Sequence, residues 1–195
     1  MITNTQELSI GDFLSMQAAK FGDREFIYDQ RERLSYSEFL EKVNCIACAL
    51  DNLGIKKDDK VGVCLPNWHE TAVIFFACAK IGATVVPFNP LYKRHEIEHI
   101  LTNSEPKVLF VSEAFEENTG IDFGKLFVKE IFSVRYTEAG IKSFEDLLEE
   151  EATCKNNITV PIHPNEDIFC ILYTSGTTGM PKGVMTTHTS IVHCA

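Results

Sequence analysis

The feature that most restricts the fold is an alternation, from Leu34 onward, of short β-branched runs with longer amphipathic runs. The short runs at residues 60–65, 84–88, 108–111 and 168–173 have the length and apolar composition of buried strands. The stretches between the first three runs are long enough for helices. Strands that alternate with helices form parallel sheets whose faces the helices cover. We therefore predict an α/β fold with a largely parallel sheet covered by helices.

The helix expected directly after Leu34 carries its own start signal. Ser35 suits the N-cap position, and Glu38 lies three residues further on, which is the spacing of a capping box. Apolar residues then recur at helical spacing until Gly54. Further helices are expected over residues 68–81, 93–101 and 144–151, with mixed loop and helix over 113–130 and a connecting loop over 152–165.

The charge balance argues against nucleic acid as a partner. The 195 residues include 18 Lys and Arg against 28 Asp and Glu, a net charge of −10 that repels phosphodiester backbones. The densest basic stretches, at residues 56–60 and 93–94, are short and have acidic neighbours. They are typical of ordinary solvated surface.

Cysteine usage and hydropathy predict a cytoplasmic protein without a transmembrane segment. The seven cysteines are odd in number and lie mostly in apolar runs, where free thiols behave as small hydrophobic side chains. Residues 1–13 show neither the basic nor the apolar part of a secretory signal. The longest apolar stretch, residues 72–79, is too short to span a bilayer.

A segment rich in glycine and hydroxyl residues, YTSGTTGMPKGV at residues 173–184, follows the last expected strand. Gly176 and Gly179 can adopt positive φ and let backbone N–H groups approach an anion. Lys182 adds a positive charge that can neutralise phosphate or pyrophosphate oxygens. The side chains that add neutral donors are those of Thr174, Ser175, Thr177 and Thr178. We therefore predict a phosphate-binding loop.

The spacing differs from that of a Walker A loop. Pro181 stands where that motif requires its second glycine, and Gly183 stands where it requires Ser or Thr. A P-loop NTPase is therefore excluded. The plain alternative is a solvent-exposed turn, since Ser, Thr and Gly are common in loops, but the length of the ordered pattern argues against a chance turn.

The segment Thr-Ser-Gly-Thr-Thr-Gly-x-Pro-Lys-Gly resembles the signature of the adenylate-forming superfamily of acyl-CoA synthetases, luciferases and peptide-synthetase adenylation domains. Residues 34–38, 62–67 and 80–90 are also similar to the family, and their order along the chain supports the resemblance. The resemblance implies that residues 1–195 are a partial N-terminal domain, the leading portion of the large domain of an acyl-CoA synthetase.

Members of that family join a carboxylate to ATP, release pyrophosphate and transfer the acyl group to a thiol, most often coenzyme A. The resemblance implies an ATP-dependent acid:thiol ligase in which residues 174–182 hold the β- and γ-phosphates with Mg²⁺. It implies that Lys182 is catalytic and that Thr174 is a metal ligand. The phosphate-binding set is Thr174, Ser175, Gly176, Thr177, Thr178, Gly179 and Lys182. The general sequence pattern of residues 87–92 favours a fatty acid as the substrate, with aryl or carnitine-type acids as alternatives.

The same resemblance implies that the adenine and ribose contacts and a catalytic C-terminal lysine lie beyond the matched region. We therefore expect residues 1–195 alone to be inactive. A non-catalytic nucleotide-site fragment or an interaction module is the alternative. Nothing in the sequence indicates an oligomeric state.

Two short patterns suggest other chemistry. His95, Glu96 and His99 satisfy the H-E-x-x-H pattern of a zinc hydrolase. A shuffled chain of this composition would show the pattern in roughly one case in fifty, so the pattern is weak evidence for a zinc site. No residue nearby in the sequence is an evident third ligand. Cys45 and Cys48 have redox C-x-x-C spacing, but they fall in mid-helix, where buried core is the expectation.

His188 follows the loop and is expected either to start a helix or to pack, with substrate contact as an open alternative. It is left outside the predicted site.

Overall fold

The computed structural model describes residues 8–121, 123–151, 158, 160–174 and 179–193, and it contains a seven-stranded sheet. The strand order is β7-β6-β5-β3-β4-β8-β9, in which all neighbouring pairs are parallel except β8 and β9. The strands are β3 (Lys60–Cys64), β4 (Thr84–Pro87), β5 (Val108–Val111), β6 (Glu130–Ser133), β7 (Lys142–Ser143), β8 (Ile168–Thr174) and β9 (Lys182–Thr187). The predicted α/β class is confirmed.

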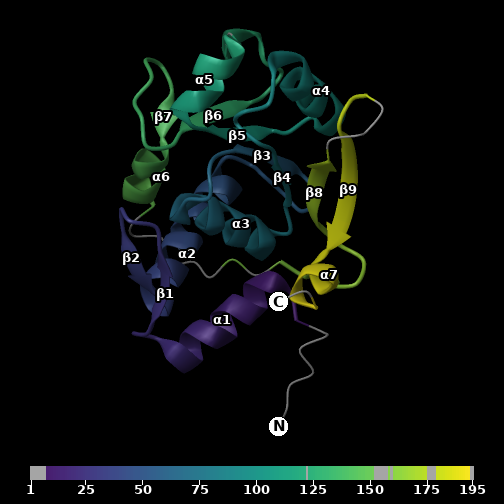
Figure 1. The fold of residues 1–195 in the computed structure, drawn as a ribbon. Helices are drawn as coiled ribbons and strands as arrows, with labels where there is room; N and C mark the ends of the chain where they lie inside the picture. The colour runs from purple at the N-terminus through teal and green to yellow at the C-terminus, as the bar shows by residue number, and fades with distance from the viewer. Residues whose placement is uncertain (1–7, 122, 152–157, 159, 175–178, 194–195) are drawn as a thin grey trace.

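Helices cover both faces of the sheet (Figure 1). The helices that pack on one face are α1 (Ile10–Phe21), α2 (Tyr36–Asn52), α3 (His69–Ile81) and α6 (Phe144–Glu150). The other face carries α4 (Arg94–Ser104) and α5 (Glu113–Thr119). The remaining elements are the two-stranded sheet of β1 (Glu25–Tyr28) and β2 (Arg33–Ser35), the 3₁₀ turn η2 (Phe123–Lys125) and α7 (His188–Val192).

The two hydrophobic cores follow from the two-residue period of the strands. In β5, Val108 and Phe110 face the core beneath α2 and α3, whereas Leu109 and Val111 face the core beneath α4. Strands that are apolar on both faces are typical of parallel sheets buried between helices. The β-branched runs therefore lie at the centre of a three-layer structure.

The start signal of α2 is confirmed. The Ser35 hydroxyl accepts a hydrogen bond from the Glu38 N–H at 3.3 Å, and the Glu38 carboxylate accepts one from the Ser35 N–H at 2.8 Å. The apolar residues at helical spacing are buried against the sheet: Phe39, Val43, Ile46, Ala47 and Leu50. Gly54 has φ 83°, a left-handed conformation that suits glycine just past a helix end.

Several elements were not foreseen from the sequence. Helix α1 begins at Ile10, with the Ser9 hydroxyl as its cap. The region predicted as mixed loop and helix, residues 113–130, does contain α5 and η2, but strand β6, which begins at Glu130, was not foreseen. Residues 182–187 form β9, whose residues are mostly exposed and lack the apolar alternation that marks a half-buried strand. This strand forms because it pairs with β8 as a hairpin.

Within the described residues, no helix is long and apolar enough to cross a membrane.

Candidate functional site

The glycine-rich segment lies at the open end of the β8–β9 hairpin. Thr174 is the last residue of β8, Lys182 is the first residue of β9, and the two residues pair across the hairpin. The Thr174 hydroxyl is exposed and lies 3.5 Å from the carbonyl oxygen of Lys182, which accepts its weak hydrogen bond. Ser175, Gly176, Thr177 and Thr178 fall outside the described residues.

The position of this loop in the sheet suits a binding site. The loop follows the carboxyl end of β8, which runs parallel to β4 and β3. Open α/β sheets bind ligands at the carboxyl ends of their parallel strands. A groove of about 630 Å³ lies at this edge, lined by segments that follow β3 and β4 and by Tyr173. The loop and the groove therefore share one edge of the sheet.

Two described residues of the loop have properties that anion binding requires. Gly179 has φ 153°, which side-chain-bearing residues rarely adopt, so the expected positive φ is observed at this glycine. Lys182 is exposed and has no ion-pair partner within the described part of the chain. Its ammonium group is therefore available to an anionic ligand.

Gly183 is required by packing, which the sequence did not reveal. A Cβ atom at this position would lie 2.9 Å from Ile171 Cγ2 and 3.3 Å from the ring of Tyr173. Tyr173 pairs directly with Gly183 across the hairpin. The aromatic ring therefore lies over the glycine and closes the hairpin beside the loop.

The two histidines of the H-E-x-x-H pattern do not form a metal centre. His95 is exposed, whereas His99 is partly buried with its Nε2 3.1 Å from the carbonyl oxygen of Pro181. Within the described ranges, the group that could supply three metal ligands does not include either histidine. The zinc-hydrolase alternative therefore gains no third ligand from this structure.

That group of possible ligands consists of Asp29, His69 and Glu70, and a guanidinium already occupies it. Arg135 forms an ion pair with Asp29 and donates to both Glu70 oxygens, at 2.8 and 2.7 Å. Burial would raise the pKa of Asp29, but hydrogen bonds from the His69 backbone N–H and from Arg135 hold that pKa well below its usual range. Arg135 supplies the positive charge that a metal would bring. We therefore regard this cluster as structural.

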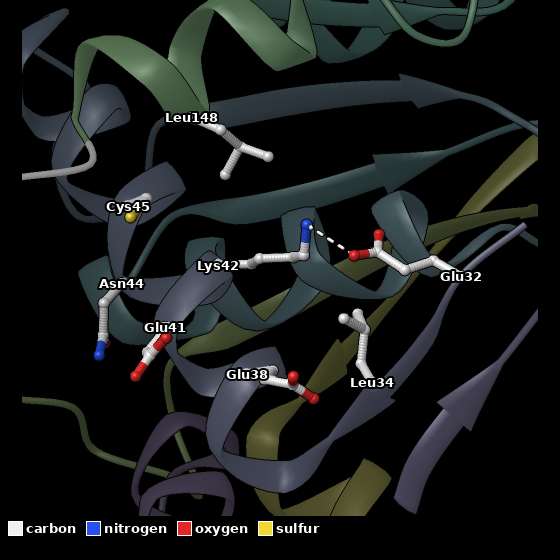
Figure 2. Close-up of a pocket in the computed structure, with 8 residues that line it drawn as sticks. All are labelled: Glu32, Leu34, Glu38, Glu41, Lys42, Asn44, Cys45 and Leu148. Carbon is white, nitrogen blue, oxygen red and sulfur yellow. Dashed lines mark ion pairs between the residues drawn. The ribbon is translucent and has the colours of Figure 1, made fainter.

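A second groove, shown in Figure 2, has the wrong charge for phosphate. It measures about 460 Å³ and is lined by residues of β2, α2 and α6 together with Glu32. Its only cation among the lining residues, Lys42, pairs with Glu32 at 3.3 Å, and Glu38 and Glu41 add two more carboxylates. Such a surface repels polyphosphate.

Cys45 also lines that groove, and its environment makes it a poor nucleophile. Burial and the carboxylate of Glu41 raise the pKa of its thiol, so the reactive thiolate is disfavoured at neutral pH. Cys48, one turn further along α2, is buried as predicted, but it is disulfide-bonded and is therefore not a free thiol of the core. Cys45 is free and only partly buried.

His188 begins α7 and is fully buried. Its Nδ1 accepts a hydrogen bond from the backbone N–H of Ile10 at 3.3 Å, which links the segment after β9 to the start of α1. Burial lowers the pKa of the imidazole to about 4, so the ring is neutral at pH 7. The packing role considered for this residue is therefore the one that its contacts support.

Comparison with known proteins identifies the family. The model of the AMP-binding enzyme family matches residues 14–195. The chain therefore belongs to the AMP-binding enzyme family. Its fold is the α/β fold of the N-terminal domain found in adenylate-forming enzymes.

Two curated relatives illustrate the range of the family. Tyrocidine synthase 1 of Brevibacillus parabrevis is 31% identical over 193 residues, which cover 99% of this chain and 16% of that protein. A long-chain-fatty-acid–CoA ligase of Bacillus subtilis (strain 168) is 30% identical over 210 residues, which cover 94% of this chain and 37% of that protein. The chain thus spans well under half the length of these relatives.

Two solved structures show the same fold. The anthranilate CoA ligase in complex with anthranoyl-AMP superposes with a TM-score of 0.86 at 26% identity, covering 94% of this chain and 35% of that one. The long-chain-fatty-acid-CoA ligase from Archaeoglobus fulgidus superposes with a TM-score of 0.80 at 33% identity. The match covers 93% of this chain and 37% of that one.

Proposed function

We propose that residues 1–195 are the leading part of the N-terminal domain of an ATP-dependent carboxylic acid:CoA ligase, and that residues 174–182 bind the polyphosphate of ATP. The observation that carries the proposal is the pairing of Thr174 with Lys182 at the carboxyl edge of the sheet. This pairing holds an exposed hydroxyl, and an ammonium group with no ion-pair partner among the described residues, on either side of the glycine-rich loop. Family membership supports the same conclusion.

The proposed reaction has two steps. In the first, a carboxylate oxygen attacks the α-phosphorus of ATP, forming an acyl-adenylate as the bond to pyrophosphate breaks. In the second, the thiol of coenzyme A attacks the acyl carbonyl, and AMP leaves. Pyrophosphate carries more negative charge as it departs, so donors that stabilise it lower the barrier of the first step.

The chain offers groups suited to that task. Lys182 would neutralise the departing pyrophosphate. The backbone around Gly179 would approach the phosphates without steric hindrance, since no atom of the part of the chain that the structure describes lies within 4 Å of a Cβ placed there. Ser175, Gly176, Thr177 and Thr178 would add the remaining donors. The Thr174 hydroxyl is an oxygen ligand of the kind that Mg²⁺ accepts. When bound, Mg²⁺ would neutralise phosphate charge and orient the β- and γ-phosphates.

For the acid, we propose a fatty acid. The support comes from relatives whose names state that they are fatty-acid CoA ligases. An aryl acid is the second candidate, because the anthranilate CoA ligase shares the fold.

The test is acid-dependent exchange of labelled pyrophosphate into ATP by the ligase that carries this chain. The panel contains long-chain, medium-chain, short-chain and aryl acids. We expect the highest exchange rate with a long- or medium-chain acid. Exchange with aryl acids alone would replace the fatty acid with an aryl substrate, and absence of exchange with every acid would contradict the ligase assignment.

A further inference from the structure

Helix α4 contacts both ends of the glycine-rich loop through two side chains one helical turn apart. The Asn103 side-chain oxygen accepts a hydrogen bond from the Tyr173 hydroxyl at 2.6 Å. His99 Nε2 lies 3.1 Å from the carbonyl oxygen of Pro181. Residues four apart on a helix project from the same face, so a single face of α4 reaches Tyr173 in β8 and Pro181 just before β9.

Each contact lies next to a residue in the predicted phosphate-binding set. Tyr173 directly precedes Thr174, and Pro181 directly precedes Lys182. A carbonyl oxygen can only accept a hydrogen bond, so the Nε2 of His99 must carry a hydrogen. Both the neutral tautomer protonated at Nε2 and the imidazolium satisfy this requirement. The contact therefore holds whether or not the imidazole is charged.

Backbone pairing with β4 does not extend to this end of the hairpin. Strand β8 pairs with β4 at Cys170 and Val85, well before Thr174. Strand β9 lies at the edge of the sheet, and its Val184 and Met185 are 48% and 67% exposed. The Tyr173 side chain is buried in the core between the sheet and α4, which also contains Cys64 and Val86. The side chains of α4 therefore act together with this packing on the open end of the hairpin.

We propose that His99 and Asn103 are positioning residues, which fix the two ends of the phosphate-binding loop and so set the placement of Thr174 relative to Lys182. This inference rests on the proposed function only for its catalytic consequence. Its structural part, that the two side chains restrain the hairpin, stands independently. The proposal also assigns His99 a role different from that of a zinc ligand.

The experiment compares His99→Phe, which keeps a ring but loses the donor, with His99→Gln, whose amide can still donate to the Pro181 carbonyl. Asn103→Leu and Asn103→Asp form a second pair, because aspartate retains the acceptor for Tyr173. His95→Phe is the control on the same helix, since His95 is exposed. Hydrogen exchange over residues 179–187 of the 195-residue chain is the structural measurement. The KM for ATP and the kcat of pyrophosphate exchange, in the ligase that carries the chain, are the functional measurements.

We expect His99→Phe and Asn103→Leu to speed hydrogen exchange at least fivefold over residues 179–187 and to raise the KM for ATP about tenfold. We expect His99→Gln, Asn103→Asp and the His95 control to stay within twofold of the wild type. Hydrogen exchange that is unchanged in both His99→Phe and Asn103→Leu would overturn the positioning role. A ligase that shows no pyrophosphate exchange with any acid would instead contradict the proposed function, while hydrogen exchange would still decide the positioning role.

Discussion

At the scale of single residues, the proposed site depends on the charge of Lys182. Lys182 is exposed at the start of β9 and lacks an ion-pair partner within the described residues. Several other cationic side chains form ion pairs, as Arg135 does with Asp29 and Glu70. A free ammonium group beside a glycine-rich loop is suited to an anionic ligand rather than to fold stability.

The first prediction concerns Lys182→Ala in the ligase that carries this chain. We expect the substitution to slow pyrophosphate exchange by an amount corresponding to about 2 to 4 kcal/mol of transition-state stabilisation, as for other preorganised electrostatic donors. Lys93→Ala is the control, because Lys93 is the exposed residue that precedes α4 and is not in the predicted phosphate-binding set. Exchange rates that are equal in the two variants would remove Lys182 from the site.

The second prediction concerns pH. The pKa of His188 is lowered from 6.5 to about 4 by burial. Between these values the unfolded chain binds a proton that the folded chain does not, so the free energy of unfolding falls as pH drops from 6.5 to 4 and is constant above 6.5. The titration of His188 lowers the free energy of unfolding by about 3 kcal/mol between pH 6.5 and pH 4.

Urea unfolding of the wild type and of His188→Asn, whose side-chain oxygen can accept from Ile10 N–H, measures this effect. We expect the variant to have a shallower dependence of unfolding free energy on pH between 4 and 6.5. Nearby Asp167 and Asp12 act in both proteins and so cancel in the comparison. Parallel pH profiles would show that His188 does not titrate in this way.

At the scale of elements, the β8–β9 hairpin is the least conventional part of the fold. It adds an antiparallel edge to an otherwise parallel sheet and carries exposed apolar side chains, among them Leu172, Val184 and Met185. Its inner contacts are close, as the position of Tyr173 over Gly183 shows. The close contact between the two strands of the hairpin therefore depends on Gly183. The placement of the hairpin depends on α4.

The third prediction concerns Gly183→Ala. The added methyl group would lie 2.9 Å from Ile171 Cγ2, and crowding of this kind costs about 1 to 3 kcal/mol. We expect a lower thermal midpoint than that of the wild type. Ile171→Leu removes the Cγ2 methyl, so the same glycine substitution in that background is expected to cost less. Equal decreases of the thermal midpoint in the two backgrounds would show that Ile171 Cγ2 is not the atom in conflict.

At the scale of the whole molecule, the described residues form a core on each face of the sheet, and we expect residues 1–195 to supply only part of the groups that the proposed reaction needs. It spans 16% of one curated relative and 37% of another. The resemblance to adenylate-forming enzymes implies that the contacts to adenine and ribose lie beyond the matched region. Residues 1–195 would thus supply the phosphate contacts and the edge of the sheet.

The fourth prediction follows from that division. We expect residues 1–195 by themselves to form no acyl-adenylate, because the α-phosphorus cannot be oriented against a carboxylate, and orientation accounts for about 7 to 11 kcal/mol of a barrier. The purified chain is incubated with ATP, Mg²⁺ and carboxylic acids, and AMP and pyrophosphate are measured by chromatography. The Lys182→Ala chain gives the background. Turnover above that background would place the essential chemistry within these residues.

The sequence by itself determined the class of fold and most of its elements, because burial and helical periodicity are local properties. The strand at Val108–Val111 and the capping box at Ser35 were both predictable from neighbouring residues. The prediction that the glycine-rich segment binds phosphate likewise came from its local composition. The existence of a hairpin after that loop could not be predicted, since residues 182–187 lack the alternation that predicts a strand.

Only the tertiary structure decided how the loop is held. Nothing in the local pattern of α4 indicates that His99 reaches Pro181, or that Asn103 accepts from Tyr173, 70 positions away in sequence. These contacts depend on the order β3-β4-β8 in the sheet and on the placement of α4 over one face. Strand order and helix placement result from packing between distant segments, which local periodicity does not encode. For the same reason, His99 fitted a zinc motif in the sequence but contacts the hairpin in the fold.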